Sequence, residues 1–508
     1  MADGSHKRKV GAVASYVYTI ASIIINLLYV PLLLGGIGRS EYGLYQMVGS
    51  IIAYLGTIST ILSAGVTRYY CQFYAAGDAD GMEHTLGIVS RIYRWATFAI
   101  AGVTAVVAVV FRLVYVDALS PWELDESILM LAILAVNVVL TMRNTISIAS
   151  ITAHEEFVFL RLTNLGTLLA QPALVLVLIR WFPVAATVCC AQLATNGAQL
   201  AIQHAYAKGR LGMSIAHDAR DAQLTKSIFQ FTGGIVLSIV ADQIFWHTDQ
   251  LILGYYYGSA VVAVYAVGAQ VVTAYHPLGT AVSSVFMPRI SQLCQTEEGR
   301  AQLPDLFCSV GRISLYPLLL VLTGFIVFGQ EFVVLWTGPD YESAYAVALI
   351  LITPFTIDLC QNIALTILQV QDRYYFRSVM YLVAAVINIG LTIAMAKLYG
   401  GIGAAIATAI SIICSSGIIM NWYYQNKVGL HVGHFWAQVG RQTAPIAVLC
   451  TVACLLKGVL PPIASWATLA LGILLYCILY ALVAYRFSAN ESERDLVQGL
   501  LRRLHVSK

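Results

Sequence analysis

The sequence of 508 residues has few charged side chains: Asp, Glu, Lys and Arg make up 11% of it, while hydrophobic residues make up 59%. A soluble domain carries about 25% charged residues, so a set of soluble domains is excluded despite the length. Apolar runs of about 20 residues recur along the chain, and this is the length that a helix needs to cross a bilayer. The composition therefore predicts an all-α polytopic membrane protein.

The sequence also lacks the short motifs of soluble active sites, since no GxxxxGK[ST], HExxH or GxSxG occurs. Without a nucleotide-binding motif, we expect an ion gradient, the membrane potential or the substrate gradient to drive any transport. The ten cysteines form no CxxC pair, so neither a disulfide framework nor a zinc site is indicated. We expect no cofactor and no nucleic-acid partner.

We predict about fourteen membrane-spanning helices, with both chain ends in the cytoplasm. The approximate spans are 12–34, 43–65, 87–111, 127–148, 158–180, 184–205, 228–253, 260–286, 308–329, 343–368, 376–396, 402–424, 442–460 and 465–485. With this topology only five of the 29 Lys and Arg residues fall on the outer side, as the positive-inside rule requires. A basic start, Lys7 to Lys9, precedes an apolar run too long for a signal peptide, so this run should remain as the first span.

Two stretches of the chain resemble two later stretches. Leu33, Gly38, Tyr45 and Ser63 match Leu253, Gly258, Tyr265 and Ser283 at an offset of 220 residues, and Glu156, Arg161 and Ala191 match Asp372, Arg377 and Ala407 at an offset of 216. A coincidence among helices rich in Gly and Ala is the alternative interpretation. If the repeat is real, six helices, a linker and six related helices form the pattern of a two-lobed transporter.

The repeat and the polar linker predict four regions. They are an N-terminal lobe at 1–205, a cytoplasmic linker at 206–227, a C-terminal lobe at 228–425, and the last two spans with a cytoplasmic tail at 426–508. The last two helices have no partner in the repeat, so we expect them to be an addition to the two lobes.

Ionisable residues inside the hydrocarbon layer are costly, and each is a functional candidate. Asp242 and Asp249 lie seven residues apart in the seventh span, which places them on one helix face. Asp358 lies in the tenth span, and these carboxylates could bind a coupling Na⁺ or a proton. Asn388 lies in the eleventh span, where a break could free backbone carbonyls for a ligand or be only a packing kink. The alternative is a structural role, in which each side chain bonds a neighbouring helix.

Six arginines lie at the inner ends of helices: Arg68, Arg91, Arg94, Arg143, Arg289 and Arg312. A guanidinium group binds phosphate bidentately, so Arg68 and Arg289, which end the two repeated hairpins, are the first candidates for an anionic headgroup. Arg91 and Arg143 are further candidates, and anchoring by the positive-inside rule is the alternative for all six. Tyr45 and Tyr265 lie within spans and could stack on sugar rings.

Three stretches together resemble the bacterial polysaccharide transporter family. They are the hairpin Pro31–Gly49, the ending Ala64–Arg68 and the run Thr248–Gly254. This family comprises flippases for O-antigen, capsule and exopolysaccharide units, within the superfamily of multidrug and toxin extrusion antiporters and lipid II flippases. The resemblance implies two six-helix lobes around a cavity in the bacterial inner membrane. Through the lipid II flippases it also implies a sodium site in the second lobe, with Asp249 or Asp242 and Asn388 as the candidates. It also implies that an undecaprenyl-pyrophosphate-linked oligosaccharide crosses by alternating access, as a substrate shared with glycosyltransferases and a polymerase.

Two other function classes are alternatives to a flippase. A cation-coupled drug antiporter would favour an acidic cavity in the first lobe, and the first six spans contain no Asp or Glu near their middle. A membrane enzyme, such as a polysaccharide polymerase or ligase, would need chemistry at the outer face and usually a large outer loop. The longest outer loop, at about 112–126, is short, so we predict a transporter and no enzyme.

Overall fold

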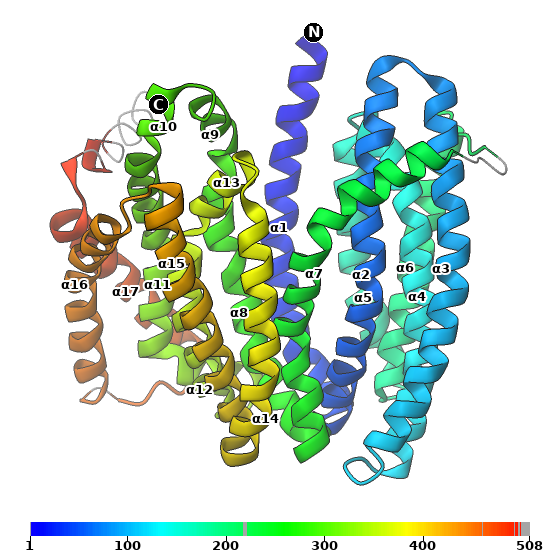
Figure 1. The fold of residues 1–508 in the computed structure, drawn as a ribbon. Coiled ribbons are helices and arrows are strands. Elements are labelled where there is room, and N and C mark those ends of the chain that lie inside the picture. Colours follow the sequence, from blue (N-terminus) through cyan, green and yellow to red (C-terminus); the bar gives the residue numbers. More distant parts are fainter. Residues whose placement is uncertain (1, 217–220, 460, 492, 496–497, 499–508) are drawn as a thin grey trace. The chain divides into compact units, whose positions relative to one another are not determined.

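The computed structural model describes residues 2–216, 221–459, 461–491, 493–495 and 498 (Figure 1). All regular elements in these ranges are helical, which confirms the all-α prediction. The first eight are α1 (Ala2–Ile37), α2 (Arg39–Ala76), α3 (Ala79–Val114), α4 (Pro121–Ala153), α5 (Phe157–Leu178), α6 (Ala185–Gly209), α7 (Ala222–Tyr257) and α8 (Ser259–Val285).

The later elements include several short or irregular helices. They are α9 (Met287–Leu293), α10 (Glu297–Ala301), α11 (Leu303–Thr337), η1 (Pro339–Tyr341), α12 (Ala344–Cys360), α13 (Asn362–Val370), α14 (Tyr374–Ile412), η2 (Ile413–Ile419), α15 (Met420–Tyr423), η3 (Tyr424–Val428), α16 (Val432–Lys457), α17 (Trp466–Val483) and η4 (Ala484–Ser488).

The chain forms two compact units, Met1–Ala263 and Val264–Lys508. In the first unit, α2 packs against α4 and α7, α4 packs against α3 and α6, and α5 packs against α1 and α6. In the second unit, α11 packs against α12, α16 and α17, and α12 packs against α14. The four regions predicted from sequence stay a prediction; residues 217–220 of the predicted linker lie outside the described residues.

Ten described helices are long and apolar enough to cross a membrane, or eleven if α12 and α13, which meet at a bend of 43°, form one span. A polytopic membrane protein is therefore confirmed, whereas the count of fourteen is not. Neither α6 nor α7 is among the ten. The run Tyr374–Val428 is counted once, although Gly400 (φ 58°, ψ −135°) breaks it between two of the predicted spans.

The first part of the sequence repeat recurs in the backbone geometry. Gly38, between α1 and α2, has φ 84° and ψ 175°, and Gly258, between α7 and α8, has φ 75° and ψ −178°. Only glycine adopts this conformation readily. Gly38 N donates to Leu34 O at 3.0 Å, and Gly258 N donates to Gly254 O at 3.1 Å. The two helical hairpins therefore turn in the same way, 220 residues apart.

The second part of the repeat also recurs, with a shift of one residue. Glu155 (φ 57°) and Asp372 (φ 55°) are the two non-glycine residues with positive φ in the described chain. Each follows a helix, and the next backbone N–H donates five residues back, from Glu156 to Ile151 O and from Arg373 to Leu368 O. The offset is thus 217 and not 216, because the structure pairs Asp372 with Glu155 instead of Glu156.

Candidate functional site

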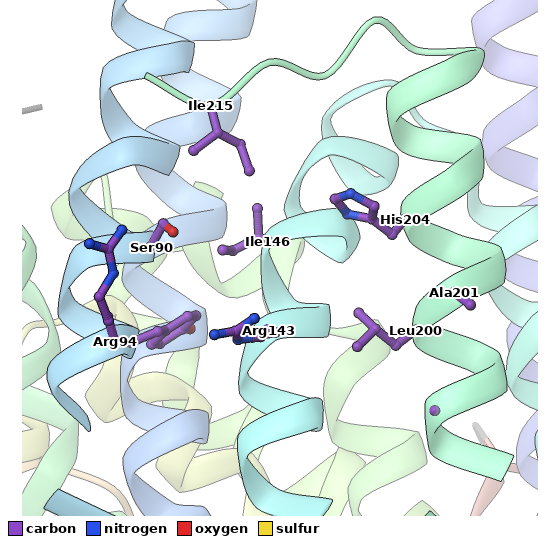
Figure 2. A pocket seen from close by; sticks show the side chains of 10 residues that line it. Ser90, Arg94, Arg143, Ile146, Leu200, Ala201, His204 and Ile215 are labelled. Atoms are coloured by element: carbon purple, nitrogen blue, oxygen red, sulfur yellow. The ribbon is translucent and has the colours of Figure 1, made fainter. Parts of the chain in front are cut away.

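A cavity of about 480 Å³ lies in the first unit among α3, α4 and α6. Figure 2 shows Arg94 on α3, Arg143 on α4 and His204 on α6 around it. The other lining residues are Ser90, Tyr93, Ile146, Gly197, Leu200, Ala201 and Ile215. Two guanidinium groups and an imidazole thus line the cavity, and the described lining contains no carboxylate.

Contacts between α4 and α6 form the walls of this cavity. Asn144 Nδ2 on α4 donates to Gln203 Oε1 on α6 at 2.8 Å, and both residues are buried. Hydrogen bonds between apolar helices hold them in a fixed register. The small residues Gly197 and Ala201 then leave space, because a Cβ at Gly197 would meet only Leu140 Cδ1, at 3.8 Å.

The segment that follows α6 covers one side of the cavity. Met213 N donates to Ala207 O at 3.0 Å, and Ala216 N donates to Glu83 O on α3 at 3.2 Å. Figure 2 shows Ile215 in this segment, where its side chain lines the cavity. The beginning of the predicted linker is therefore part of the wall.

The charges in the cavity are available to a ligand. The side chains of Arg94 and Arg143 are exposed, and neither makes an ion pair or hydrogen bond with another described residue. His204 Nδ1 lies 3.4 Å from Ser147 Oγ. Because guanidinium groups bind phosphate with two parallel hydrogen bonds, the arrangement suits a phosphate or diphosphate group.

Exposed aromatic residues on α3 indicate the depth of the cavity in the membrane. Trp95, next to Arg94, is 71% exposed, and Phe98, one turn further, is 67% exposed. Tryptophan is enriched where the bilayer meets water, at the level of the lipid headgroups. We therefore expect the cavity to lie where α3 enters the bilayer, on the side that the basic residues predict to be cytoplasmic.

The cavity brings together only part of the predicted arginine set. Arg143 lines it, whereas Arg91 is half-buried on α3, one turn before Arg94, and is not part of the lining. Arg68 is exposed near the end of α2, and Arg289 is exposed on α9 of the second unit. A role of Arg68, Arg91 and Arg289 in substrate binding stays a prediction.

The two predicted tyrosines lie on different helices. Tyr45 is half-buried in α2. Tyr265 is 4% exposed in α8, and its ring contacts the position that a Cβ on Gly401 would occupy, at 3.9 Å. A ring that stacks on sugar needs an accessible face, and Tyr45 is the more accessible of the two rings. Stacking by either residue stays a prediction.

The first two predicted cation ligands lie on α7. Asp249 is 1% exposed and Asp242 is half-buried. Gln250, next to Asp249, accepts a hydrogen bond from Ser50 Oγ on α2 at 2.7 Å. The stretch around Asp249 is therefore a packed contact between α7 and α2, and cation binding there stays a prediction.

The other two predicted cation ligands lie in the second unit. Asn388 is fully buried; its Nδ2 donates to Thr408 Oγ1 at 3.3 Å, and its Oδ1 accepts from Ser411 Oγ at 3.1 Å. These bonds join the two parts of the broken helix α14, as the structural alternative expects. Asp358 is half-buried on α12, within electrostatic reach of Arg377. A cation site at Asn388 and Asp358 stays a prediction.

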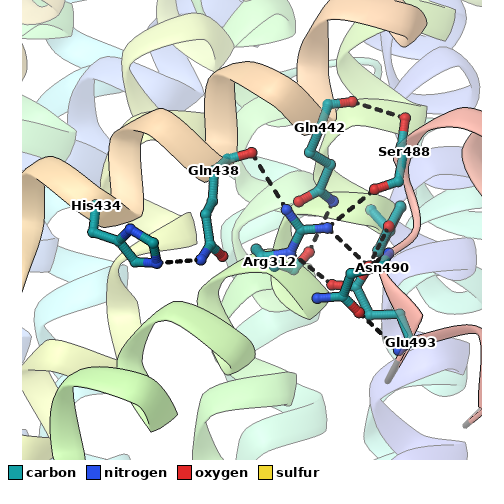
Figure 3. A network of polar contacts seen from close by, with 8 residues as sticks. Arg312, His434, Gln438, Gln442, Ser488, Asn490 and Glu493 are labelled. Carbon is teal, nitrogen blue, oxygen red and sulfur yellow. Dashed lines mark hydrogen bonds and ion pairs between the residues drawn. The ribbon is translucent and has the colours of Figure 1, made fainter.

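Arg312 has a structural role. It is 5% exposed, and its Nε and Nη2 donate to the two carboxylate oxygens of Glu493 at 2.8 and 2.9 Å (Figure 3). Nη2 also donates to Ser488 O at 3.0 Å, and Gln442 Nε2 donates to Arg312 O at 3.0 Å. Arg312 thus joins α11 to α16 and to the segment after α17, and it is not available to a phosphate.

Sequence reasoning missed His204 and gave Arg94 no special place among the inner arginines. A usable pattern was present in α6, where the polar side chains of Asn196, Gln199, Gln203 and His204 recur in an otherwise apolar helix. Their spacing places them on neighbouring helix faces, toward other helices and away from lipid. Only the packing of α4 against α3 and α6 shows which of them reach a cavity.

Sequence comparisons match this chain to a family model and to two named proteins. Residues 10–294 match the family model described as "Polysaccharide biosynthesis protein". A protein of Shigella flexneri named as an O-antigen transporter is 20% identical over 399 residues, which cover 78% of this chain and 92% of that protein. A protein of Haloferax volcanii named as the flippase AglR is 27% identical over 176 residues, which cover 33% of this chain and 36% of that protein.

Solved structures of transporters share the fold. The lipid II flippase MurJ in an inward closed conformation matches with a TM-score of 0.74 at 12% identity, covering 96% of this chain and 99% of that chain. An inward-facing multidrug resistance transporter of the MATE family matches with a TM-score of 0.60 at 11% identity, covering 82% of this chain and 96% of that chain. The prediction of a transporter and not an enzyme is confirmed. Since the family model matches residues 10–294, more than half of the 508 residues, this chain belongs to the polysaccharide biosynthesis protein family.

Proposed function

We propose that this protein is a flippase that moves undecaprenyl-pyrophosphate-linked oligosaccharides from the inner to the outer leaflet of the bacterial cytoplasmic membrane by alternating access. The family membership and the names of the two relatives support this proposal. Glycosyltransferases would supply the substrate, and a polymerase would use the product to build surface polysaccharide. Both termini would lie in the cytoplasm.

The observation that carries the proposal is the cationic cavity among α3, α4 and α6. Its volume of about 480 Å³ is that of a small-molecule pocket, large enough for a diphosphate and too small for a lipid tail with a whole glycan. Arg94 and Arg143 would replace the water around the diphosphate with charge-assisted hydrogen bonds, each worth about 1.5–3 kcal/mol. The prenyl chain would stay in the bilayer, because we expect the cavity to lie where α3 enters it.

The test is translocation by the purified protein in lipid vesicles. A fluorescent prenyl-pyrophosphate oligosaccharide is placed in both leaflets, and a membrane-impermeant quencher reports how fast the protected pool reaches the outside. The proposal expects a rate well above that of protein-free vesicles. It also expects little transport of a prenyl glycan without the diphosphate. Equal rates with and without the protein would refute the flippase function.

A cation-coupled drug antiporter is the second candidate, because transporters of the MATE family share the fold. It would export a cationic dye from vesicles that carry an ion gradient, and the lipid-linked glycan would not compete. The described lining of the cationic cavity disfavours this candidate, since the two guanidinium groups of Arg94 and Arg143 repel a cationic drug. The same vesicles, loaded with dye in place of glycan, decide between the two functions.

A further inference from the structure

Two carboxyl groups meet at the N-terminus of α6. One of them, Glu126, lies seventeen residues before Arg143 of the cationic cavity on α4, which is about 25 Å along the helix. Ala185 N donates to Glu41 Oε2 at 2.8 Å, and Ala186 N donates to Glu126 Oε1 at 2.9 Å. Glu41 lies in the first turn of α2, and Glu126 lies near the beginning of α4. Consecutive amide groups of α6 thus hold carboxyl groups from two other helices side by side.

One oxygen of this pair has no donor. Glu126 is 6% exposed, and its Oε2 is buried without a hydrogen-bond partner among the described residues. Glu41 lies within hydrogen-bonding contact of Glu126. If both groups were ionised, two negative charges would touch in a buried place, and Oε2 would stay unsatisfied. Two carboxylates that share such a site do not both ionise readily.

We propose that Glu41 and Glu126 form a proton-binding site in which one proton bridges the two carboxyl groups. The proton lies between Oε2 of Glu126 and the carboxyl group of Glu41, so that the oxygen without a donor takes part in a hydrogen bond. The pair then carries one negative charge, which the positive end of α6 stabilises. This inference stands on the contacts in the first unit and does not depend on the proposed function.

Glu123, one turn before Glu126 on α4, has a different environment. Glu123 Oε1 accepts hydrogen bonds from Ser40 Oγ and from Ser259 Oγ, both at 2.7 Å. Its Oε2 accepts from Ser120 N at 2.9 Å. Because hydroxyl and amide donors satisfy both oxygens, Glu123 is stable as an anion and serves as a matched control for Glu126.

The remaining titratable neighbours do not replace the shared proton. Asp125 forms an exposed ion pair with Arg112 at 3.0 Å. On α6 the buried thiol of Cys189 faces the pair, and Tyr29 and Tyr45 lie near that thiol. A thiol and two phenols are neutral near neutral pH, so they bring no positive charge to the pair. A sodium ion fits poorly, since Glu41 Oε2 and Glu126 Oε1 already accept hydrogen bonds from N–H groups of α6, whose positive end repels a cation.

The site links proton binding to helix packing. Loss of the shared proton would place two negative charges where α2, α4 and α6 meet, and their repulsion would oppose the packing of these helices. Binding of the proton therefore stabilises this end of the first unit. The conformation of the unit becomes sensitive to pH at this point.

Infrared difference spectroscopy on the purified full-length protein tests the proposal, because a protonated carboxyl group has its own C=O band. In the wild type near neutral pH, we expect the band of one carboxylic acid per chain that is absent from E41Q and from E126Q. The control E123Q should keep the band. Absence of the band from the wild type, or its persistence in both E41Q and E126Q, would overturn the proposal.

Thermal unfolding provides a second readout. The Tm of the wild type should fall as pH rises through the range in which this band disappears. The Tm of E126Q should not fall there, because the amide group of glutamine donates a hydrogen bond to Glu41 and needs no bound proton. The same change of Tm with pH in both proteins would contradict the proposal. So would a shift of the band when Na⁺ replaces choline at constant ionic strength, since that result indicates a metal cation.

Discussion

The arginines at the inner helix ends differ in what their guanidinium groups contact. Arg312 is buried and bonds both oxygens of Glu493, whereas Arg94 and Arg143 are exposed beside a cavity. Sequence position alone treats the three as equivalent, since all lie near the predicted cytoplasmic side. The bonds to Glu493 give Arg312 a structural role. The guanidinium groups of Arg94 and Arg143 bond no other described residue, so they are available to an anion.

Loss of the Arg312–Glu493 pair should destabilise the second unit strongly. Removing one partner leaves an uncompensated buried charge, so R312A should lower the free energy of unfolding by about 3–5 kcal/mol. The measurement is the Tm of the purified protein. R112A is the control, because its ion pair with Asp125 is more than half exposed and contributes about 1 kcal/mol or less. Equal effects of R312A and R112A would contradict the structural role.

The same pair predicts a dependence on acid. Burial alone raises the pKa of Glu493, but hydrogen bonds from Arg312, from Asn490 N and from Tyr316 outweigh it and hold the pKa below its ordinary value. A carboxyl group with a lowered pKa stabilises the fold above its unfolded pKa of about 4.3, and this contribution is lost as pH falls through the folded pKa.

The wild type should therefore lose an acid-sensitive part of its stability only below about pH 4. E493Q lacks the titrating group, so its Tm should be lower at neutral pH and closer to that of the wild type in acid. A plot of Tm against pH for both proteins checks this result. A constant difference in Tm across the acid range would show that the carboxylate contributes no pH dependence.

At the scale of helices and turns, the repeated hairpin is the best-predicted feature. Gly38 and Gly258 share a conformation that other residues avoid, so the local sequence alone determines where α1 and α7 end. The break at Gly400 likewise falls between two predicted spans. Such features can be predicted because a glycine and a change in hydropathy are local signals.

Replacing either turn glycine should therefore destabilise the protein. G258A should cost roughly 1–3 kcal/mol in the free energy of unfolding, because alanine is strained at φ 75° and ψ −178°. G102A is the control: Gly102 lies inside α3, a Cβ there meets nothing within 4 Å, and alanine should be neutral or slightly stabilising. The two Tm values give the comparison, and a G258A protein as stable as G102A would contradict the assigned backbone strain.

The cavity and the buried charged residues were harder to predict because they depend on packing between distant segments. Glu126 falls just before the predicted span 127–148, so the sequence assigned it to an outer loop, whereas α4 begins at Pro121 and buries it. The partner of Arg312 lies 181 residues away, in a tail without an apolar pattern. The cavity exists because Gly197 and Ala201 face α4, and no local signal gives that orientation.

At the level of the whole molecule, transport driven by an ion gradient requires a coupling ion and a site that binds it. If Asp249 binds a coupling cation, transport should depend on Na⁺ or on pH in the wild type and should lose that dependence in D249N. The expected effect is on the ion dependence of the rate, with D125N as an exposed control that retains it. The measurement is the initial transport rate in vesicles at several ion gradients; an identical ion dependence in wild type and D249N would remove Asp249 from the coupling site.

Translocation of a fluorescent prenyl-pyrophosphate oligosaccharide, measured in vesicles that contain wild type, R143A or R143K, tests most directly whether the cavity binds a diphosphate. Loss of a charge-assisted hydrogen bond of about 1.5–3 kcal/mol predicts a rate at least about tenfold lower for R143A. R143K keeps the charge without the bidentate geometry and should be intermediate. R112A, whose arginine pairs with Asp125, should match the wild type. Equal rates in wild type, R143A and the double variant R94A/R143A would contradict a diphosphate site in this cavity.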